Sequence, residues 1–290
     1  MLYILIVLGI FIIICIIKWI SDVNFFRTVR YEISSEKLEK DYSFVLLTDL
    51  HCKRFGPKNV RLLSEVKKLN PDSVLISGDL ITANKRVSTK PAEELIESLS
   101  GQYPIYYGMG NHENKICECK EMYGSMYDDY SAELLKSGVT MMGNEVRSVQ
   151  GNNIDIYSFV LPQKYFEWKS RNKLTPSKED IEEKIGACRK ERFNILLAHN
   201  PDFFPVYAKW EPDLVLSGHN HGGIIGVPFF GGLISPRIEF FPKFDGGEFT
   251  DGNSKMILSR GLGTHTIPVR FMDKAELVYI KLKAEKNGTA

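Results

Sequence analysis

Apolar and polar positions alternate along most of the chain in the manner of an α/β protein. Short β-branched runs are separated by stretches in which apolar residues recur every three or four positions, a rhythm typical of strands joined by helices. In the first half this rhythm predicts strands at 44–47, 73–77 and 105–107 with helices at 59–69 and 92–99. In the second half it predicts strands at 193–198, 214–217, 256–259 and 276–282 with a helix at 201–207. Pairs of facing sheets with helices outside them fit this order.

The chain begins with an apolar run that lacks this alternation. Residues 1–17 carry no charged side chain, and Trp19 and Ile20 extend the apolar stretch beyond Lys18. About 20 apolar residues cross the hydrocarbon core of a bilayer, so residues 1–20 are predicted to form one transmembrane helix. A cleaved signal peptide is the alternative, but no basic residue precedes the run and no small-residue cleavage site follows it. A buried core helix is disfavoured because every face of the run is apolar.

The residues after this run predict its orientation and the organisation of the rest. Lys18, Arg27 and Arg30 outnumber Asp22 on this flank, so the positive-inside rule places the remainder of the chain on the cytoplasmic side of a cell membrane. We expect one domain after the anchor, with a juxtamembrane linker at 21–42, the domain at 43–283 and a tail at 284–290.

The composition excludes some classes of protein. With 43% hydrophobic and 25% charged residues, the chain is an ordinary globular protein rather than a disordered one. Lys and Arg number 37 against 36 Asp and Glu, so there is no basic field and no nucleic-acid partner is expected. The 5 cysteines include no C-x-x-C pair, which argues against a disulfide framework or a zinc ribbon. Cys117 and Cys119 are interpreted as free thiols.

Polar residues of the kinds that bind metal ions follow five predicted strands at the points where those strands end. In open α/β sheets, ligands gather in the loops beyond the carboxyl ends of the strands, so these loops are expected to converge. The residues are Asp49 and His51 after the strand at 44–47, Asp79 after 73–77, Asn111, His112 and Glu113 after 105–107, His199 after 193–198, and His219 and His221 after 214–217.

These residue types suit a metal centre for phosphate chemistry. Carboxylate and imidazole ligands bind borderline divalent ions such as Mn²⁺, Fe²⁺ or Zn²⁺, and the two oxygens of Asp79 allow it to bridge two ions. Two ions held about 3.5–4 Å apart make a water nucleophilic and neutralise phosphoryl oxygens. A single histidine after a strand is most often structural, but five of the 6 histidines in this chain lie in these motifs. A metal site accounts for all five.

The motifs resemble those of the calcineurin-like metallophosphoesterases, and the resemblance covers residues 43–283. It implies a metallophosphoesterase domain with an α/β fold, a four-layer α/β/β/α sandwich of two mixed sheets. The apolar amino terminus and the sequences at 221–223, 241–243 and 259–263 are similar to a bacterial membrane-associated branch. Some members of that branch hydrolyse UDP-diacylglucosamine.

The resemblance also implies a role for each site residue. The first ion would be held by Asp49, His51 and His221, the second by Asn111, His199 and His219, and both by the bridging Asp79. His112 would donate a proton to the leaving oxygen or stabilise the phosphoryl charge, and Glu113 would orient His112 by a hydrogen bond. Ile224 and Asn200 depart from the pattern of the branch, which leaves the substrate open.

Residues outside these motifs are candidates for substrate contacts. Arg260 precedes a glycine turn and is a candidate for bidentate binding of a phosphate, with surface ion pairing as the alternative. His265, in the same loop, is a second candidate. The basic and aromatic stretch 161–176 is either a cap over the site or a solvated insertion. The aromatic stretch 224–244 is either an apolar wall for a lipid or ordinary core.

We therefore predict a membrane-anchored, dinuclear metal-dependent phosphoesterase that hydrolyses phosphate esters, diesters or pyrophosphates. Its cofactors would be two divalent ions, chosen from Mn, Fe and Zn, and its partners a phosphorylated substrate and the membrane crossed by residues 1–20. The anchor suggests a lipid or nucleotide-lipid substrate. The alternatives are a non-catalytic, metal-stabilised interaction module at the membrane, and a phosphatase or nuclease of the same fold that acts on soluble substrates.

Overall fold

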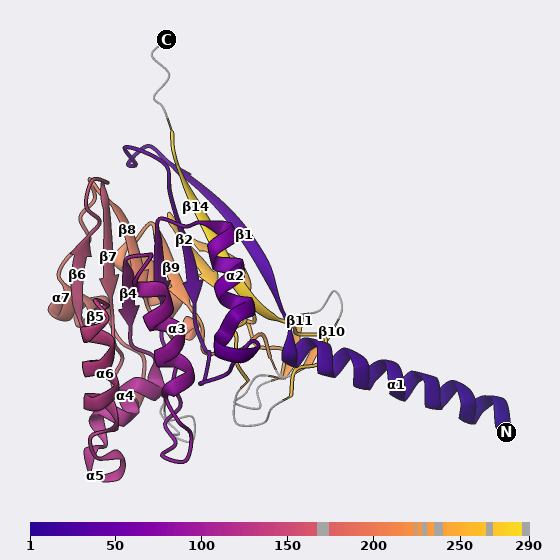
Figure 1. The fold of residues 1–290 in the computed structure, drawn as a ribbon. Helices are drawn as coiled ribbons and strands as arrows, with labels where there is room; N and C mark the ends of the chain where they lie inside the picture. The colour runs from indigo at the N-terminus through magenta and orange to yellow at the C-terminus, as the bar shows by residue number, and fades with distance from the viewer. Residues whose placement is uncertain (167–173, 224, 228–230, 235–239, 265–268, 286–290) are drawn as a thin grey trace.

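The structure, a computed structural model of residues 1–290, describes the whole chain except residues 167–173, 224, 228–230, 235–239, 265–268 and 286–290. The chain starts with a long helix, α1 (Leu2–Asn24), which projects away from the rest of the molecule (Figure 1). The rest is built around two six-stranded sheets that face each other.

The first sheet combines four parallel strands with a pair that closes one edge. Its spatial order is β1 (Phe26–Ser35), β14 (Ala275–Ala284), β2 (Tyr42–Leu47), β3 (Ser73–Ile76), β4 (Ile105–Gly108) and β5 (Thr140–Met142). Strands β2 to β5 are parallel, whereas β14 is antiparallel to β2 and parallel to β1. All four residues of β3 are buried, because helices cover one face of the sheet and the second sheet covers the other.

Helices from the first half of the chain cover the outer face of this sheet. They are α2 (Val60–Leu69), preceded by a 3₁₀ turn (Pro57–Asn59), α3 (Lys90–Ser100), α4 (Asn111–Glu118), α5 (Lys120–Tyr123) and α6 (Met126–Lys136). In α3, Ala92, Leu95, Ile96 and Leu99 recur at three- or four-residue spacing, and all are buried. Pro91 fits the first turn of α3 because the backbone N–H that it lacks has no partner within the helix there.

The second sheet is formed by the second half of the chain. Its spatial order is β12 (Gly247–Asp251), β13 (Ser254–Leu258), β9 (Leu214–Ser217), β8 (Phe193–Leu197), β7 (Ile154–Ser158) and β6 (Glu145–Ser148). The second half of the chain also forms the helices α7 (Lys178–Ile185) and α8 (Phe204–Trp210) and the 3₁₀ turns Gln163–Phe166 and Pro201–Phe203. A separate small hairpin consists of β10 (Ile225–Val227) and β11 (Gly231–Ile234).

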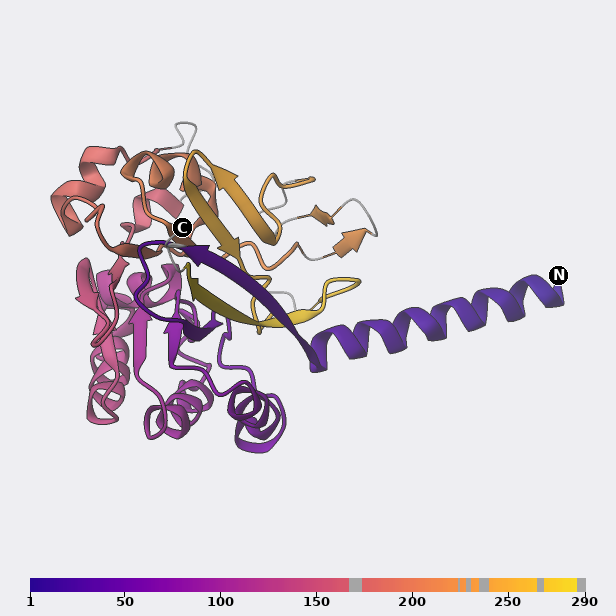
Figure 2. The same cartoon turned by 90° about the horizontal axis from the view of Figure 1, so that it is seen from above.

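Three separate hydrophobic cores confirm the predicted four-layer α/β/β/α sandwich. One core joins the first sheet to α2, α3 and α6, and includes Leu62 and Leu95. The middle core lies between the sheets and includes Phe44 and Leu216, and the third joins the second sheet to α7 and α8. Figure 2 shows the two sheets stacked between their helices, with α1 outside the sandwich.

The expected linker at 21–42 is not a linker in this structure. Residues Phe26–Ser35 form β1, which pairs with β14 over its full length, and α1 continues to Asn24. The strand forms because Val29, Tyr31 and Ile33 alternate with polar residues, so that one face of the strand packs while the other stays in solvent. Helix α1 therefore leads into the first sheet with only Phe25 between the two elements.

The middle core gives a test of the sandwich. Phe44 is fully buried between the sheets, so Phe44→Ala is expected to destabilise the protein by about 3–5 kcal/mol, because it removes apolar contacts and leaves a cavity. The measurement is thermal unfolding of the full chain in detergent. Leu135→Ala, on the exposed face of α6, is the control and should change stability by less than about 0.5 kcal/mol. Equal effects of the two substitutions would contradict the assigned packing.

Candidate metal centre

The predicted ligand residues meet where the parallel strands of both sheets end. Asp49 and His51 follow β2, Asp79 follows β3, and Asn111 and His112 open α4 directly after β4; His199 follows β8, and His219 and His221 follow β9. Because the two sheets face each other, the loops of β2, β3 and β4 lie against those of β8 and β9. Hydrogen bonds cross between the sheets here, as when His219 N donates to the Asp49 carboxylate at 3.1 Å.

The backbone at this centre has an unusual conformation. Left-handed φ values are uncommon outside glycine and cost about 1–3 kcal/mol each where the residue is strained. At this centre, hydrogen bonds between the loops stabilise the left-handed conformations: Asp49 N donates to Gly78 O and His51 N donates to Asp79 O, both at 3.1 Å. Five of the predicted ligands have this conformation: Asp49 (52°), His51 (49°), Asp79 (56°), His219 (73°) and His221 (50°).

Glycines allow the loops to touch. Gly78 has a φ of 99°, and a Cβ there would lie 2.2 Å from Gly110 N. A Cβ on Gly110 would lie 2.2 Å from Asp79 Oδ1, and one on Gly218 would lie 2.2 Å from Asp49 Oδ2. Of these three glycines, only Gly78 has a left-handed φ. Gly110 and Gly218 are instead required because neighbouring ligands approach their backbone closely.

One group of potential ligand atoms comes from Asp49, His51 and His221, whose atoms all lie within 4.8 Å of one another. His51 Nε2 and His221 Nε2 are 3.0 Å apart, and His221 Nε2 is 3.4 Å from Asp49 Oδ1. Ligands at about 2.0–2.2 Å from one ion are separated from each other by about 2.9–3.6 Å. The separations of 3.0 and 3.4 Å lie in this range, while His51 Nε2 is 4.0 Å from Asp49 Oδ1, so the three atoms surround a common position for one divalent ion with one pair wider than in a coordination shell.

A second group comes from Asp79, His199 and His219, again within 4.8 Å. His199 Nε2 is 3.1 Å from Asp79 Oδ2. One arm of the Asn111 amide points into this group, 2.7 Å from His219 Nδ1, 3.2 Å from Asp79 Oδ2 and 3.3 Å from His199 Nε2. When that arm is the NH₂ group it donates to these acceptors, and when it is the oxygen the four lone-pair atoms surround a site for a cation.

Asp79 connects the two groups. It belongs to the group of His199 and His219, and also to a third group with His51 and His112. His199 Nε2 is 3.1 Å from Asp79 Oδ2 and 3.8 Å from Asp49 Oδ1. The candidate ligands therefore form one continuous cluster of carboxylate oxygens and imidazole nitrogens.

Buried charge shifts the pKa values of these groups in the ion-free site. Burial raises the pKa of Asp49 to about 6. Burial lowers the pKa of His199, but the carboxylates of Asp79 and Asp49 outweigh it and raise that pKa to about 9. Burial also disfavours the charged form of Asp79, but His199 and His112 hold the pKa of Asp79 well below its usual range. Protons thus occupy positions that an ion would take.

The ring of His112 is oriented by the backbone. Ala83 N donates to His112 Nδ1 at 2.8 Å, and because an amide N–H can only donate, Nδ1 must be the acceptor. The ring proton of neutral His112 is therefore on Nε2, which is 3.9 Å from Asp79 Oδ2. Burial lowers the pKa of His112, which favours this neutral form. His112 accordingly offers an N–H donor at the edge of the ligand cluster.

Glu113 does not orient His112, contrary to the expectation from sequence. Its buried carboxylate accepts hydrogen bonds from Asp79 N (2.8 Å), Gly110 N (3.0 Å), Ile81 N (3.2 Å) and the Tyr107 hydroxyl (2.8 Å). Burial raises the pKa of Glu113 to about 7. Glu113 therefore caps α4 and fixes the loop that carries Asp79.

The two residues predicted to contact substrate, Arg260 and His265, are not both described by the structure. Arg260 is part of a structural brace: its guanidinium bonds Asp273 at 2.9 Å, Asp245 at 3.4 Å and Gly222 O at 3.3 Å. These bonds replace the predicted phosphate contact. Asp273 also pairs with the buried Arg270 at 3.0 Å, a partnership that sequence reasoning missed because no pattern in the sequence links the two residues. His265 lies outside the residues that the structure describes.

The brace of Arg260, Asp273 and Arg270 supports a metal-ligand loop. Arg270 donates to Gly263 O at 2.6 and 2.9 Å and to His221 O at 3.4 Å. Because a buried arginine with this many acceptors is fully used in holding backbone, its role is to fix the loops after β9 and β13.

Each of the two aromatic stretches, 161–176 and 224–244, is described only in part, and their described aromatic residues lie in different environments. In 161–176, the described Phe166 packs edge-on against the His219 ring, with centroids 5.3 Å apart, so this part contacts the site, while 167–173 lie outside the described residues. In 224–244, Phe244 is buried in the third core, whereas Phe240 and Phe241 are exposed. Residues 224, 228–230 and 235–239 of that stretch lie outside the described part.

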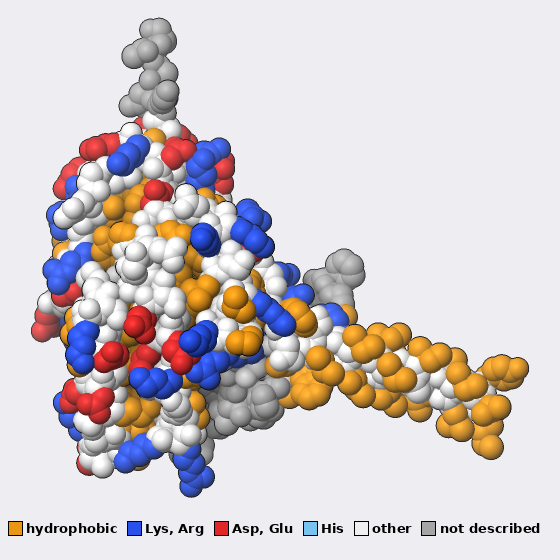
Figure 3. Space-filling view, in the orientation of Figure 1, with side chains coloured by type: hydrophobic (Ala, Val, Ile, Leu, Met, Phe, Trp, Pro, Cys, Tyr) orange, Lys and Arg blue, Asp and Glu red, His pale blue; other side chains and the backbone are white. Residues whose placement is uncertain are grey.

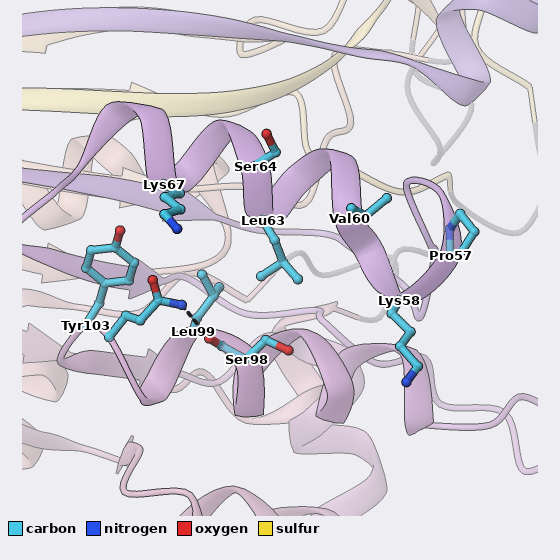
Figure 4. Close-up of a pocket in the computed structure, with 10 residues that line it drawn as sticks. Pro57, Lys58, Val60, Leu63, Ser64, Lys67, Ser98, Leu99 and Tyr103 are labelled. Atoms are coloured by element: carbon cyan, nitrogen blue, oxygen red, sulfur yellow. Dashed lines mark hydrogen bonds between the residues drawn. The ribbon is translucent and has the colours of Figure 1, made fainter.

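A cavity of about 690 Å³ lies elsewhere, between α2 and α3 (Figure 4). Leu63 and Leu99 line it, and Lys58 and Lys67 stand near its rim. Its walls come from these helices and the loops beside them, so it is separate from the ligand cluster.

Known proteins are similar to this chain in sequence. A sequence model of calcineurin-like phosphoesterases matches residues 42–223. The chain is 26% identical over 226 residues to the uncharacterized metallophosphoesterase YkuE of Bacillus subtilis, which is 76% of this chain and 70% of that protein. It is 27% identical over 278 residues to a transmembrane protein with metallophosphoesterase domain of Danio rerio, 89% of this chain and 57% of that protein. It is 24% identical over 254 residues to phosphodiesterase YaeI of Escherichia coli, 83% of each chain.

The role of Glu113 can be tested without any assay of activity. In Glu113→Gln, an NH₂ group would face backbone N–H donors, so the variant is expected to lose about 1–3 kcal/mol of stability and to bind Mn²⁺ at least tenfold more weakly. Thermal unfolding and calorimetric titration with Mn²⁺ measure both effects. Glu121→Gln, on the exposed face of α5, is the matched control and should change neither. Unchanged Mn²⁺ affinity in Glu113→Gln would contradict this role.

Ion binding should release protons. His199, with a pKa of about 9, is mostly protonated below that pH in the ion-free site, and Asp49 gains a proton below about pH 6. Because both must lose these protons to bind an ion, apparent Mn²⁺ affinity is expected to fall as pH decreases from 9, and more steeply below 6. Calorimetry at pH 7.5 in buffers of different ionisation enthalpy counts the protons released. An affinity that is constant from pH 9 to 6 would refute the competition.

Proposed function

The chain belongs to the calcineurin-like phosphoesterase family and is a metal-dependent phosphoester hydrolase, and from this premise we propose that it is a membrane-anchored enzyme with a dinuclear metal centre. The observation that carries the proposal is the position of Asp79, which groups with His199 and His219 and also lies within 4.8 Å of His51, a member of the other group. A carboxylate between two such groups can hold two ions side by side.

The ligand assignment follows the two groups. We assign Asp49, His51 and His221 to the first ion, Asn111, His199 and His219 to the second, and Asp79 to both. The donor set of carboxylate, amide oxygen and imidazole suits Mn²⁺, Fe²⁺ or Zn²⁺ and needs no thiolate. When bound, such ions make water nucleophilic and neutralise charge on the phosphoryl oxygens.

The residues around the ligands prepare the site for a phosphate ester. His112 presents its Nε2–H toward the space beside Asp79, because Ala83 N occupies the opposite ring nitrogen. From there the Nε2–H can donate to a phosphoryl oxygen or to the leaving oxygen. Glu113 holds the backbone of Asp79 and Gly110 in place, so the ligand and the donor keep a fixed separation.

The membrane anchor is the second part of the proposal. One described helix, Leu2–Asn24, is long and apolar enough to cross a bilayer, with a mean hydropathy of 2.9 over its most apolar window and none of that window buried. Figure 3 shows its apolar side chains exposed along the whole projecting helix. The Danio rerio relative is named as a transmembrane protein, which agrees with a membrane anchor in this chain. The basic flank favours a cytoplasmic domain, and the anchor favours a lipid or nucleotide-lipid substrate.

The alternative of a non-catalytic module at the membrane lacks a supporting observation. Such a module has no use for an N–H donor beside the ligands, whereas His112 is held in that position by a specific backbone bond. The proposal covers hydrolysis of phosphate monoesters and of phosphate diesters. Because the Escherichia coli relative is named as a phosphodiesterase, diesters are the first substrate class to assay.

Two substitutions separate metal binding from chemistry. The full chain in detergent, loaded with Mn²⁺, is expected to hydrolyse bis(4-nitrophenyl) phosphate or 4-nitrophenyl phosphate. Asp79→Asn should lose the bridging charge, bind less metal and lose at least about 10³-fold in kcat. His112→Asn should keep the wild-type metal content, measured by plasma mass spectrometry, while kcat falls by about 10²–10⁴.

Lys115→Gln, on the exposed side of α4, is the matched control and should behave as wild type in both measurements. If the metal-loaded wild-type chain turns over neither ester, the interaction-module alternative replaces this proposal. If His112→Asn loses metal together with activity, then the assigned division of roles is incorrect.

A further inference from the structure

The base of α1 is docked on the domain through two hydrogen bonds. Asp22 is buried, pairs with Lys18 of its own helix and accepts a hydrogen bond from Met272 N at 2.8 Å. Lys53 Nζ donates to Val23 O near the end of the helix. The direction of the helix is therefore fixed relative to the loop that contains Met272.

One further contact and the start of the first strand tighten this junction. The guanidinium of Arg61 lies over the Phe25 ring, 4.9 Å from its centroid, and β1 begins at the next residue, Phe26. Because β1 then pairs with β14 without interruption, the helix cannot swing about a flexible hinge at this point.

A ladder of backbone contacts extends from Met272 along one side of the domain. Phe271 forms a bridge with Ile225 of β10, and Gly226 N donates to Phe271 O at 2.8 Å. β10 pairs with β11, and beyond β11 Phe240 bridges Ile234 while Phe241 N donates to Leu233 O at 3.0 Å. Figures 1 and 2 both place β10 and β11 on the side of the domain from which α1 projects.

Large apolar side chains are exposed along this ladder. Their exposed fractions are 47% for Phe25, 45% for Met272, 67% for Phe240 and 61% for Phe241. Exposed apolar side chains that gather on one face mark an interaction site. Met272 and Phe241 also have left-handed backbones, with φ of 57° and 49°, which are unfavourable for side chains of this size. The fold therefore holds two strained positions that display apolar groups to the outside.

Basic side chains accompany these apolar groups. Lys243 is exposed beside Phe241, with its Nζ 5.0 Å from the centroid of Phe244. Figure 3 shows Lys and Arg side chains on the domain next to the base of α1. Aromatic rings flanked by basic side chains suit the interface of a bilayer, where rings lie at headgroup level and cations meet lipid phosphates.

The same segment leads to the metal centre. Only three residues lie between His221 and Ile225, so their Cα atoms are at most roughly 14 Å apart along a fully extended chain. Gly232 of β11 also packs on the loop of the ligand, since a Cβ there would lie 2.7 Å from Gly222 O. The exposed ladder and the ligand loop therefore belong to one connected structure.

We propose that Phe25, Met272, Phe240 and Phe241 form a membrane-seating surface, which rests in the headgroup region of the bilayer that α1 crosses. This inference rests on the proposed function for its anchor and its chemistry. The seating surface and the docked helix together hold the metal centre at a fixed height above the headgroups. The substrate class that this geometry selects is a phosphate ester of a lipid that stays in the membrane.

A first experiment tests contact with lipid and needs no enzyme activity. The full chain is reconstituted in vesicles of phosphatidylcholine with an anionic phospholipid, carrying Phe241→p-benzoylphenylalanine, and is irradiated. Phospholipid adducts at position 241 are expected by mass spectrometry. The matched control is Leu135→p-benzoylphenylalanine, at an equally exposed position (57%) on α6, which lies on the opposite side of the domain in Figures 1 and 2. Absence of adducts at 241, or equal yields at both positions, would overturn the proposal.

A second experiment measures the consequence. Phe240→Glu combined with Phe241→Glu is expected to lower turnover of a long-chain phosphatidic acid in vesicles at least tenfold, while turnover of bis(4-nitrophenyl) phosphate changes less than twofold. Met122→Glu combined with Leu135→Glu, at two exposed apolar positions away from α1, should change neither. Equal losses on both substrates, or no loss on vesicles, would reject a seating role. Failure of the wild type on every ester would reject the proposed function instead, and leaves the adduct measurement valid.

Discussion

Three buried carboxylates, those of Asp49, Asp79 and Glu113, lie where the loops of the two sheets meet, and the surrounding structure is arranged to stabilise their charge. An unpaired buried carboxylate is costly, so each one requires donors or cations. Glu113 is satisfied by backbone N–H groups and the Tyr107 hydroxyl. Asp49 and Asp79 are met by fewer donors and by the histidines, and this residual negative charge is what a divalent cation neutralises.

The need to stabilise these carboxylates explains why unfavourable backbone conformations occur at the site. Left-handed φ values at Asp49, Asp79 and His219 and the close approach at Gly110 are unfavourable locally. They persist because strands buried on both faces anchor each loop at its root, and these cores do not deform easily. The fold therefore holds the ligand atoms at spacings near those of a coordination shell. The rigidity of the sandwich is what makes the site.

The buried strands could be predicted from the sequence because a strand that is buried on both faces appears as a continuous run of apolar residues. Strands such as β3 and β9 appear as continuous apolar runs, and the ligands that follow them lie together as expected, although their binding of ions stays a prediction. The strand β1 was misread as a linker because an edge strand with one solvated face carries charged residues at alternate positions. The partners of Glu113 and Arg260 were missed because they are backbone amides or residues distant in sequence, which no spacing rule marks.

The edge strand matters because it connects the anchor to the site. Arg27 of β1 pairs with Glu276 of β14 at 3.3 Å, and the same carboxylate accepts Arg260 N at 2.8 Å. Arg260 in turn pairs with Asp273, which also holds Arg270 against the backbone of His221. An anchor joined by a flexible linker would let the site sample substrates at any height above the membrane. Under the proposed anchoring, a helix that continues into the sheet and then into the ligand brace would fix that height, and we therefore expect the reach of the substrate's phosphate above the bilayer to be a criterion of specificity.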